Sequence, residues 1–185
     1  MIIMKRFILA VFGCALASMA SAQITTNIPL TRIESLESHT QTILIKGFAP
    51  VGSMTVEGDV ISVRIKATSE VNTGHKLQAA VVEIAGKQEI DRIVIDYDEI
   101  DSLLNGIDFM SKADYGLSPL PGFDATYTTR AGLRVAAYTS RRSETIQPYI
   151  QSNTSGRLDL TANQLAELRS LIQQAKTNLD SLESK

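Results

Sequence analysis

The stretch IVIDYDEIDSLLNGI, residues 93–107, contains a change of hydrophobic period that divides the chain. Its first residues alternate as in a β-strand, and apolar residues then recur at spacings of three and four, which is typical of an amphipathic helix. The recurring residues are Ile100, Leu103, Leu104, Ile107 and Met110. We therefore predict that a strand ends here and that a helix over about 98–112 is inserted between two groups of strands.

The acidic residues of this stretch raise the question of a metal site. A calcium-binding EF-hand loop needs oxygen ligands at positions one, three and five and a glycine at position six. Counted from Asp96, position five is Ile100 and position six is Asp101, so the pattern fails. Asp98 and Asp101 are instead interpreted as a helix cap rather than a site, because carboxylates favour the first turn of a helix. Gly106 costs this helix about 1 kcal/mol relative to alanine and marks either a bend or a close approach.

Segments of strand character lie on both sides of the predicted helix. Before it, residues 42–48, 60–68 and 77–84 are rich in β-branched and apolar residues, and 89–97 returns after a glycine turn as the second strand of a hairpin. The segment 77–84 is almost uniformly apolar, which indicates an interior strand covered on both faces. After the helix, 123–151 reads as a meander of three strands.

The strongest helical pattern closes the chain, over about 161–181. Thr161 and Gln164 form a capping-box pair, and apolar residues continue from Leu165 to Leu179 along one face. The predicted fold class is α+β: a curved antiparallel sheet or partly open barrel of about 7–9 strands. The inserted helix and the C-terminal helix pack on this sheet.

The first 22 residues have the pattern of a secretory signal peptide. Lys5 and Arg6 precede an apolar run, and Ala20 and Ala22 provide an A-x-A cleavage site. The run is shorter than the about 20 apolar residues that span a bilayer. A retained membrane anchor and a lipoprotein signal ending at Cys14 are the alternatives. We predict cleavage after Ala22 and a periplasmic or secreted protein.

Removal of residues 1–22 takes away the only cysteine and two basic residues, so 16 basic and 20 acidic residues remain. This mildly acidic balance argues against a nucleic-acid-binding protein. No further apolar run approaches membrane-spanning length, so we expect no transmembrane segment in the mature chain. We divide the chain into a signal peptide (1–22), a leader of uncertain structure (23–41) and a single α+β domain (42–185). Within the leader, residues 31–40 fit either a short helix or a strand.

Four arginines fall on the strands and turns of the meander and could form an anion-binding or partner-binding patch. They are Arg130, Arg134, Arg141 and Arg142. The alternative is that they are solvated charges at strand ends, which keep sheet edges from aggregating. His39 and His75 stand in polar surroundings without the local spacing of a zinc site or a catalytic motif. We expect no cofactor, no metal and no catalytic residue.

Parts of two segments, 95–113 and 123–129, together with the closing helix, resemble a recurrent type of secreted bacterial protein with no assigned activity. The order of strands followed by a C-terminal helix is also similar in outline to pleckstrin-homology-like barrels, which concerns the fold alone. The resemblance supplies no catalytic residue.

The sequence favours a non-catalytic secreted or periplasmic interaction module that binds a protein or an envelope polymer. Such a module predicts an exposed apolar patch or an unpaired strand edge. The alternative is a carrier of a small apolar ligand or lipid, which predicts a cavity between the sheet and the helices. A hydrolase is the third hypothesis and predicts a histidine within reach of a carboxylate and a hydroxyl.

Overall fold

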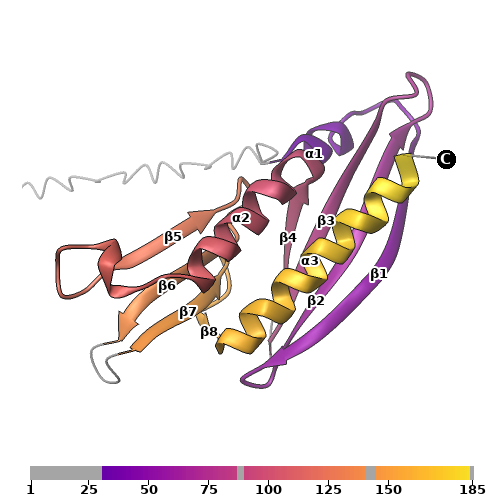
Figure 1. The fold of residues 1–185 in the computed structure, drawn as a ribbon. Helices are drawn as coiled ribbons and strands as arrows, with labels where there is room; N and C mark the ends of the chain where they lie inside the picture. The colour runs from indigo at the N-terminus through magenta and orange to yellow at the C-terminus, as the bar shows by residue number, and fades with distance from the viewer. Residues whose placement is uncertain (1–30, 87–89, 141–144, 184–185) are drawn as a thin grey trace, which may run out of the picture.

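The computed structural model describes residues 31–86, 90–140 and 145–183, which form two four-stranded antiparallel sheets and three α-helices (Figure 1). The first sheet has the order β1 (Leu44–Val56), β2 (Asp59–Glu70), β3 (Lys76–Ala85) and β4 (Ile90–Asp96). The second has the order β5 (Asp124–Thr128), β6 (Arg134–Ser140), β7 (Thr145–Gln151) and β8 (Leu158–Asp159). The helices are α1 (Arg32–Glu37), α2 (Ile100–Ser111) and α3 (Ala162–Glu183), with short 3₁₀ turns η1 (Tyr97–Glu99) and η2 (Tyr115–Leu117).

The α+β class, the inserted helix and the C-terminal helix are confirmed, but the expected single sheet or partly open barrel is wrong. The strands form two separate sheets, with no pairing between β4 and β5. The physical reason lies in the change of period at Ile100. The chain leaves the first sheet through η1 and α2, and β5 then begins a new sheet on which α2 packs.

Strands β1 and β2 form a hairpin whose turn lies at Glu57 and Gly58. Val56 pairs with Asp59, which leaves Glu57 and Gly58 as a two-residue loop with φ of 53° and 97°. Positive φ at both positions is the type I′ geometry that matches the twist of hairpin strands and favours glycine. Upstream, the strand predicted over 42–48 does not end there, because a register shift between Pro50 and Gly52 lets β1 continue to Val56. Proline is tolerated there since β1 is an edge strand.

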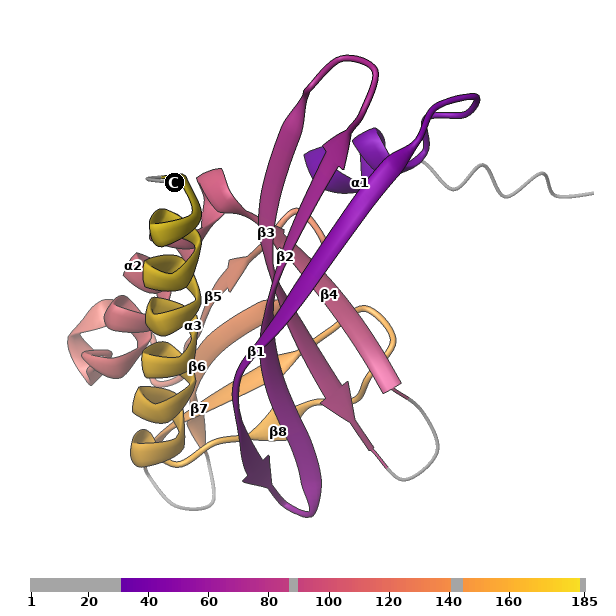
Figure 2. The ribbon, with the colours of Figure 1, turned by 90° about the vertical axis from the view of Figure 1, so that its right-hand side faces the viewer.

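Strand β3 is covered on both faces, as its apolar composition predicts. Ala80 and Val82 point into the main core, which α2 and α3 complete, whereas Ala79 and Val81 pack beneath Ile33 of α1. Successive side chains of a strand point to opposite faces, so α1 and α3 lie on opposite sides of the first sheet (Figure 2). Residues 32–37 of the predicted leader are therefore a helix that packs on this sheet.

Helices α2 and α3 run side by side, with α3 packed on the first sheet and α2 on the second (Figures 1 and 2). Leu103 and Ile107 of α2 meet Leu168 and Ile172 of α3 in one fully buried cluster. Burial of each such side chain contributes roughly 1.5–3 kcal/mol. Helix α3 begins with the predicted capping box, in which Thr161 Oγ1 accepts from Gln164 N and Gln164 Oε1 accepts from Thr161 N.

Gly106 marks a close approach, one of the two outcomes left open by the sequence. A Cβ atom at this position would lie 2.8 Å from Cγ of the Tyr127 ring on β5. Helix α2 therefore rests directly on the second sheet at this residue, and a larger side chain would push the two apart.

Candidate functional site

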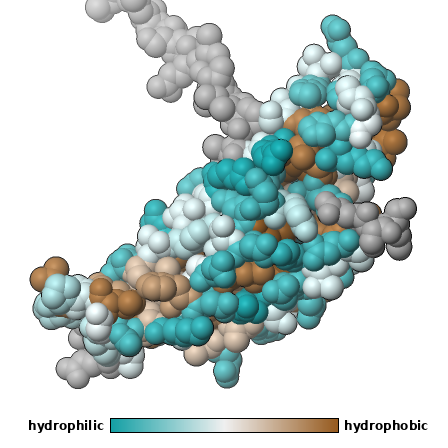
Figure 3. Space-filling view, turned by 45° about the horizontal axis from the view of Figure 1, so that its top comes forward, coloured by the Kyte–Doolittle hydropathy of each residue, from teal (hydrophilic) through white to brown (hydrophobic). Residues whose placement is uncertain are grey.

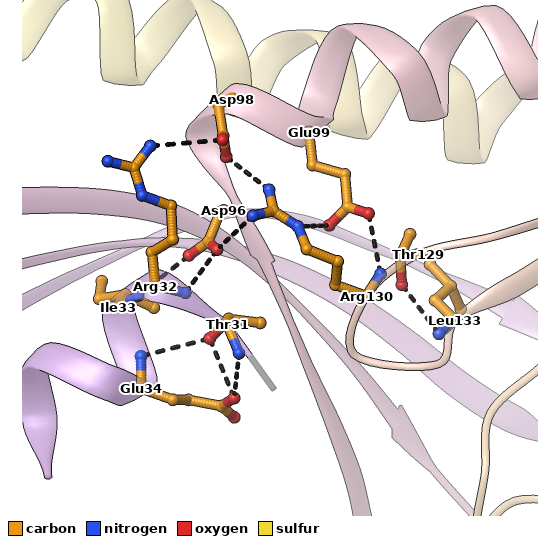
Figure 4. A network of polar contacts seen from close by, with 10 residues as sticks. All are labelled: Thr31, Arg32, Ile33, Glu34, Asp96, Asp98, Glu99, Thr129, Arg130 and Leu133. Atoms are coloured by element: carbon orange, nitrogen blue, oxygen red, sulfur yellow. Dashed lines mark hydrogen bonds and ion pairs between the residues drawn. The ribbon is translucent and has the colours of Figure 1, made fainter. Parts of the chain in front are cut away.

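A charged cluster occupies the joint between β4 and α2, where the period of the sequence changes (Figure 4). Arg130, from the turn before β6, faces three carboxylates: its Nη2 donates to Asp98 Oδ1 at 2.6 Å, its Nη1 lies 3.4 Å from Asp96, and its Nε lies 3.4 Å from Glu99. Arg32 of α1 reaches the other oxygen of Asp98, at 3.4 Å. Asp98 thus bridges two arginines that are 98 residues apart in the sequence.

Asp96 fastens α1 to the first sheet. Its two carboxylate oxygens accept from the backbone N–H groups of Arg32, at 2.6 Å, and Ile33, at 3.1 Å. These are among the N–H groups that a helix leaves without internal partners at its start. Asp96 is almost fully buried. The same helix carries its own capping box, because Thr31 and Glu34 bind each other's backbone N–H groups.

Glu99 fixes the turn that carries Arg130. Its Oε1 accepts from the Arg130 backbone N–H at 2.8 Å. In the same turn, Thr129 Oγ1 accepts from Leu133 N at 3.0 Å, and Gly132 has a φ of +88° that favours glycine. The joint therefore connects three parts of the fold: α1, the start of α2 and the β5–β6 turn.

Electrostatics favour the charged forms of Asp98 and Arg130. Burial alone would raise the pKa of Asp98, but hydrogen bonding and charge from Arg130 and then Arg32 lower it below its usual range. The hydrogen bond to Asp98 raises the pKa of Arg130, against the opposing effect of burial. Two guanidinium groups among three carboxylates nearly neutralise each other. The arrangement therefore suits a structural joint better than a site for a charged ligand.

Asp98 and Asp101 stand in the first turns of η1 and α2, as the interpretation requires, but the expected capping hydrogen bonds are not formed. Neither η1 nor α2 has a side-chain hydrogen bond at its N-cap. Asp98 faces the two arginines instead, and Asp101 accepts from Lys176 Nζ of α3 at 2.5 Å. The interpretation failed because η1 precedes α2, so both carboxylates have better partners in other elements than the first free N–H groups of the helix.

The predicted arginine patch is not assembled around Arg130, whose guanidinium is held by carboxylates. Arg134 lies on β6 with its side chain exposed, next to Tyr149. Arg141 and Arg142 lie outside the described residues. The patch stays a prediction, and the part of it that can be described gives it no support.

Both histidines border Glu70, and the backbone carbonyl of His75 accepts from Glu70 N at 2.9 Å. His39 Nδ1 is 3.2 Å from Glu70 Oε1, and the hydroxyl of Thr73 donates to the other oxygen of the same carboxylate. A catalytic triad places the histidine between the hydroxyl and the acid. Here the carboxylate stands in the middle, so Thr73 is not activated by His39. Within the described ranges, no group of three or more His, Cys, Asp and Glu side chains could hold a metal ion.

The surface of the described residues carries pockets, and three of them bear on function. One of about 470 Å³ runs along the polar side of α3, and one of about 280 Å³ lies beside Ile90 and Asp91. The third, of about 400 Å³, borders the charged joint. It is lined by Arg32, Lys76, Leu77, Gln78, Asp96, Tyr97, Asp98 and Leu182.

The sequence did not single out Arg32, and it left residues 31–40 open between a short helix, which the structure shows, and a strand. The signal was present, because Thr31 and Glu34 have the spacing of a capping box, the pattern that did identify α3. No helix in the described part of the chain combines the length and apolar character needed to cross a bilayer.

The fold and the joint define a two-sheet α+β protein. The arginines and carboxylates of the joint pair with one another. No protein-family model, curated protein or solved structure matches this chain.

Proposed function

We propose that this protein is a non-catalytic interaction module that binds another protein through its first sheet. The supporting observation is a set of large apolar side chains on this sheet that the helices leave between 42% and 64% exposed. Phe48 on β1, Val60 on β2 and Ile90 on β4 lie on one face of the sheet. Ile45 on β1 points to the other face, and Ile43 lies beside the start of β1. Exposed apolar groups gathered on one element are a common feature of interaction sites.

The edge of the first sheet adds to this proposal. Strand β1 spans 13 residues and pairs only with β2 among the described strands. An open edge can accept an extended segment of a partner. Pro50 and the register shift after it restrict regular pairing to residues 44–49, which is about the length of an average strand. Figure 3 shows hydrophobic surface toward the end of the molecule where β1 begins.

The interior gives the carrier hypothesis no support. The space between the sheets and the helices, where a ligand cavity was expected, is occupied by buried side chains of α2, α3 and both sheets. The pockets described above lie at the surface and have mixed polar and apolar linings. The contacts of His39 give the hydrolase hypothesis no support, because the Glu70 carboxylate lies between the histidine and the Thr73 hydroxyl.

The proposed setting is the periplasm or the exterior of a bacterial cell. It rests on the signal-peptide pattern of residues 1–22 and on the resemblance to secreted bacterial proteins. N-terminal sequencing of the exported protein tests it, with Gln23 as the expected first residue. An exported chain that retains the apolar run would contradict it.

Site-specific photo-crosslinking in a secreting bacterium tests the module. A photoreactive residue at Phe48 is expected to give one discrete protein adduct, and one at Gln174, on the exposed side of α3, is expected to give none. Equal labelling from both positions, or no adduct from Phe48, would contradict the proposal. Native mass spectrometry of the exported protein provides the second readout, because a retained lipid would favour the carrier.

A further inference from the structure

The face of the first sheet that points away from α2 and α3, here called the outer face, is covered by α1 at one end only (Figure 2). At the other end, Val60, Ala85 and Ile90 pair in one register row across three strands. Val60 is 42% and Ile90 61% exposed. This row is an apolar strip with no helix on it among the described residues.

Positive charge borders the strip. Glu83 accepts from Arg64 at 2.6 Å and from Arg92 at 2.5 Å, and Arg92 remains 63% exposed. Nearer α1, Glu37 is shared by Lys46 and Lys66, at 3.0 and 2.7 Å. At the uncovered end two arginines thus face one carboxylate, on a chain whose formal net charge is −2. The uncovered end of the outer face therefore carries a local excess of positive charge.

Phe48 extends this surface toward the edge strand. Its ring lies 5.8 Å from the Arg64 guanidinium and 5.7 Å from Lys66 Nζ. Cations placed over an aromatic ring within about 6 Å are attracted to it. Phe48 pairs with Lys66, six residues along β2 from Val60 and toward α1. Its exposed ring between two cations offers contacts to apolar and acidic groups at this second place on the outer face.

Helix α1 shows what kind of segment the outer face accepts. Its apolar residues Ile33 and Leu36 are buried toward the sheet, and the carboxylate of Glu37 binds the two lysines. The uncovered end likewise combines an apolar row, which contains Val60 and Ile90, with two arginines that share one carboxylate. Helix α1 therefore indicates that a helix with apolar residues on one side and a carboxylate beside them fits this face.

We infer that the uncovered end of the outer face binds an acidic amphipathic helix of another protein, placed beside α1. Apolar side chains of the partner cover Val60 and Ile90, and its carboxylates pair with Arg92 and Arg64. This inference rests on the proposed function and names the partner class. A second copy fits less well, because two outer faces of equal charge repel each other. An anionic membrane also fits less well, because the net negative charge of the chain would repel it.

The test uses the full exported protein and a synthetic peptide of about 18 residues, long enough to populate a helix. The peptide repeats the Ile-x-x-Leu-Glu pattern of α1, and a matched peptide carries lysine in place of each glutamate. The acidic peptide is expected to bind, and Arg92→Glu is expected to weaken binding by about tenfold or more. The lysine peptide is expected to recover binding to the same variant.

Lys112→Glu is the matched control, because it makes the same charge change at an exposed position after α2. It is expected to leave peptide affinity within about twofold of wild type, since exposed charges far from a site are screened. Ile90→Glu, with circular dichroism to confirm folding, tests the apolar strip separately.

Three outcomes would overturn the inference. Peptide affinity unchanged by Arg92→Glu would show that the outer face is not the site. Binding to phosphatidylglycerol vesicles that Arg92→Glu abolishes would assign the face to a membrane. Self-association lost in the same variant would assign it to a second copy. If the adduct from Phe48 persists in Arg92→Glu cells, the interaction module stands and only this inference fails.

Discussion

The Asp108 carboxylate of α2 accepts two hydrogen bonds from the Arg169 guanidinium of α3, at 2.5 and 2.9 Å. Seven residues earlier on α2, Asp101 meets Lys176, seven residues later on α3. Matched spacings of two helical turns in opposite directions show that the helices are antiparallel along their polar sides. The Tyr97 hydroxyl continues this series by donating to Asp180 at 2.5 Å.

The first prediction concerns the Asp108–Arg169 pair. A double-mutant cycle of Asp108→Asn and Arg169→Met is expected to give a coupling free energy below about 1 kcal/mol, because both side chains are more than a third exposed. Urea unfolding of the four proteins measures it. A coupling of several kcal/mol would mean that the pair carries more of the helix packing than its exposure indicates.

The second prediction concerns Gly106. Alanine raises helix propensity by about 1 kcal/mol. At this position, however, its Cβ would lie 2.8 Å from the Tyr127 ring, so Gly106→Ala is expected to destabilise the protein by about 1–3 kcal/mol. The neighbouring exposed change Asn105→Ala lacks this clash and is expected to be neutral or stabilising. Thermal unfolding of both variants measures the difference in stability. Equal stability of the two would contradict the close approach of Gly106 to Tyr127.

The third prediction concerns the attachment of α1. Asp96→Ala removes both acceptors from the N–H groups of Arg32 and Ile33 and is expected to destabilise by about 1–2 kcal/mol. Hydrogen exchange is expected to accelerate in α1 more than in α3. Thr161→Ala is the control, because it removes the cap of α3 instead. Uniform acceleration across the chain in Asp96→Ala would show that α1 does not open separately.

The fourth prediction concerns acid. Burial raises the pKa of Glu37, but Lys66, Thr68 and Lys46 together lower it below its usual range. A carboxyl group with a lowered pKa in the folded state stabilises the fold above its unfolded pKa, about 4.3. This contribution is lost as the pH falls from there through the folded pKa. Hydrogen exchange in α1, corrected for its intrinsic pH dependence, is expected to accelerate over that window.

Glu37→Gln provides the matched control for the acid effect. The substitution keeps the shape of the side chain but removes its charge, so the pH dependence contributed by Glu37 is expected to disappear. An unchanged acid response in Glu37→Gln would assign that response to other carboxyl groups.

Much of the local structure was predictable because it depends on neighbouring residues. The period change at Ile100 placed α2, and the Thr161–Gln164 capping box placed the start of α3. The uniform apolar run of β3 correctly indicated cover on both faces.

The candidate site was less predictable because its contacts join distant parts of the chain. Asp98 looked like a helix cap from the residues around it, but its arginine partners stand 66 and 32 residues away. No local spacing contains that information. The division into two sheets was missed for a similar reason, because strand composition does not specify which strand forms the next neighbour.

The sequence by itself determined the positions of most helices and strands, the α+β class and the signal-peptide pattern, since these follow from periodicity, capping and turn residues. Only the tertiary structure decided that β4 and β5 belong to different sheets, and that the acidic residues of the stretch 93–107 hold α1, the β5–β6 turn and α3. The reason is physical. A carboxylate in a folded chain pairs with the donor that packing brings within reach, and packing depends on every element at once.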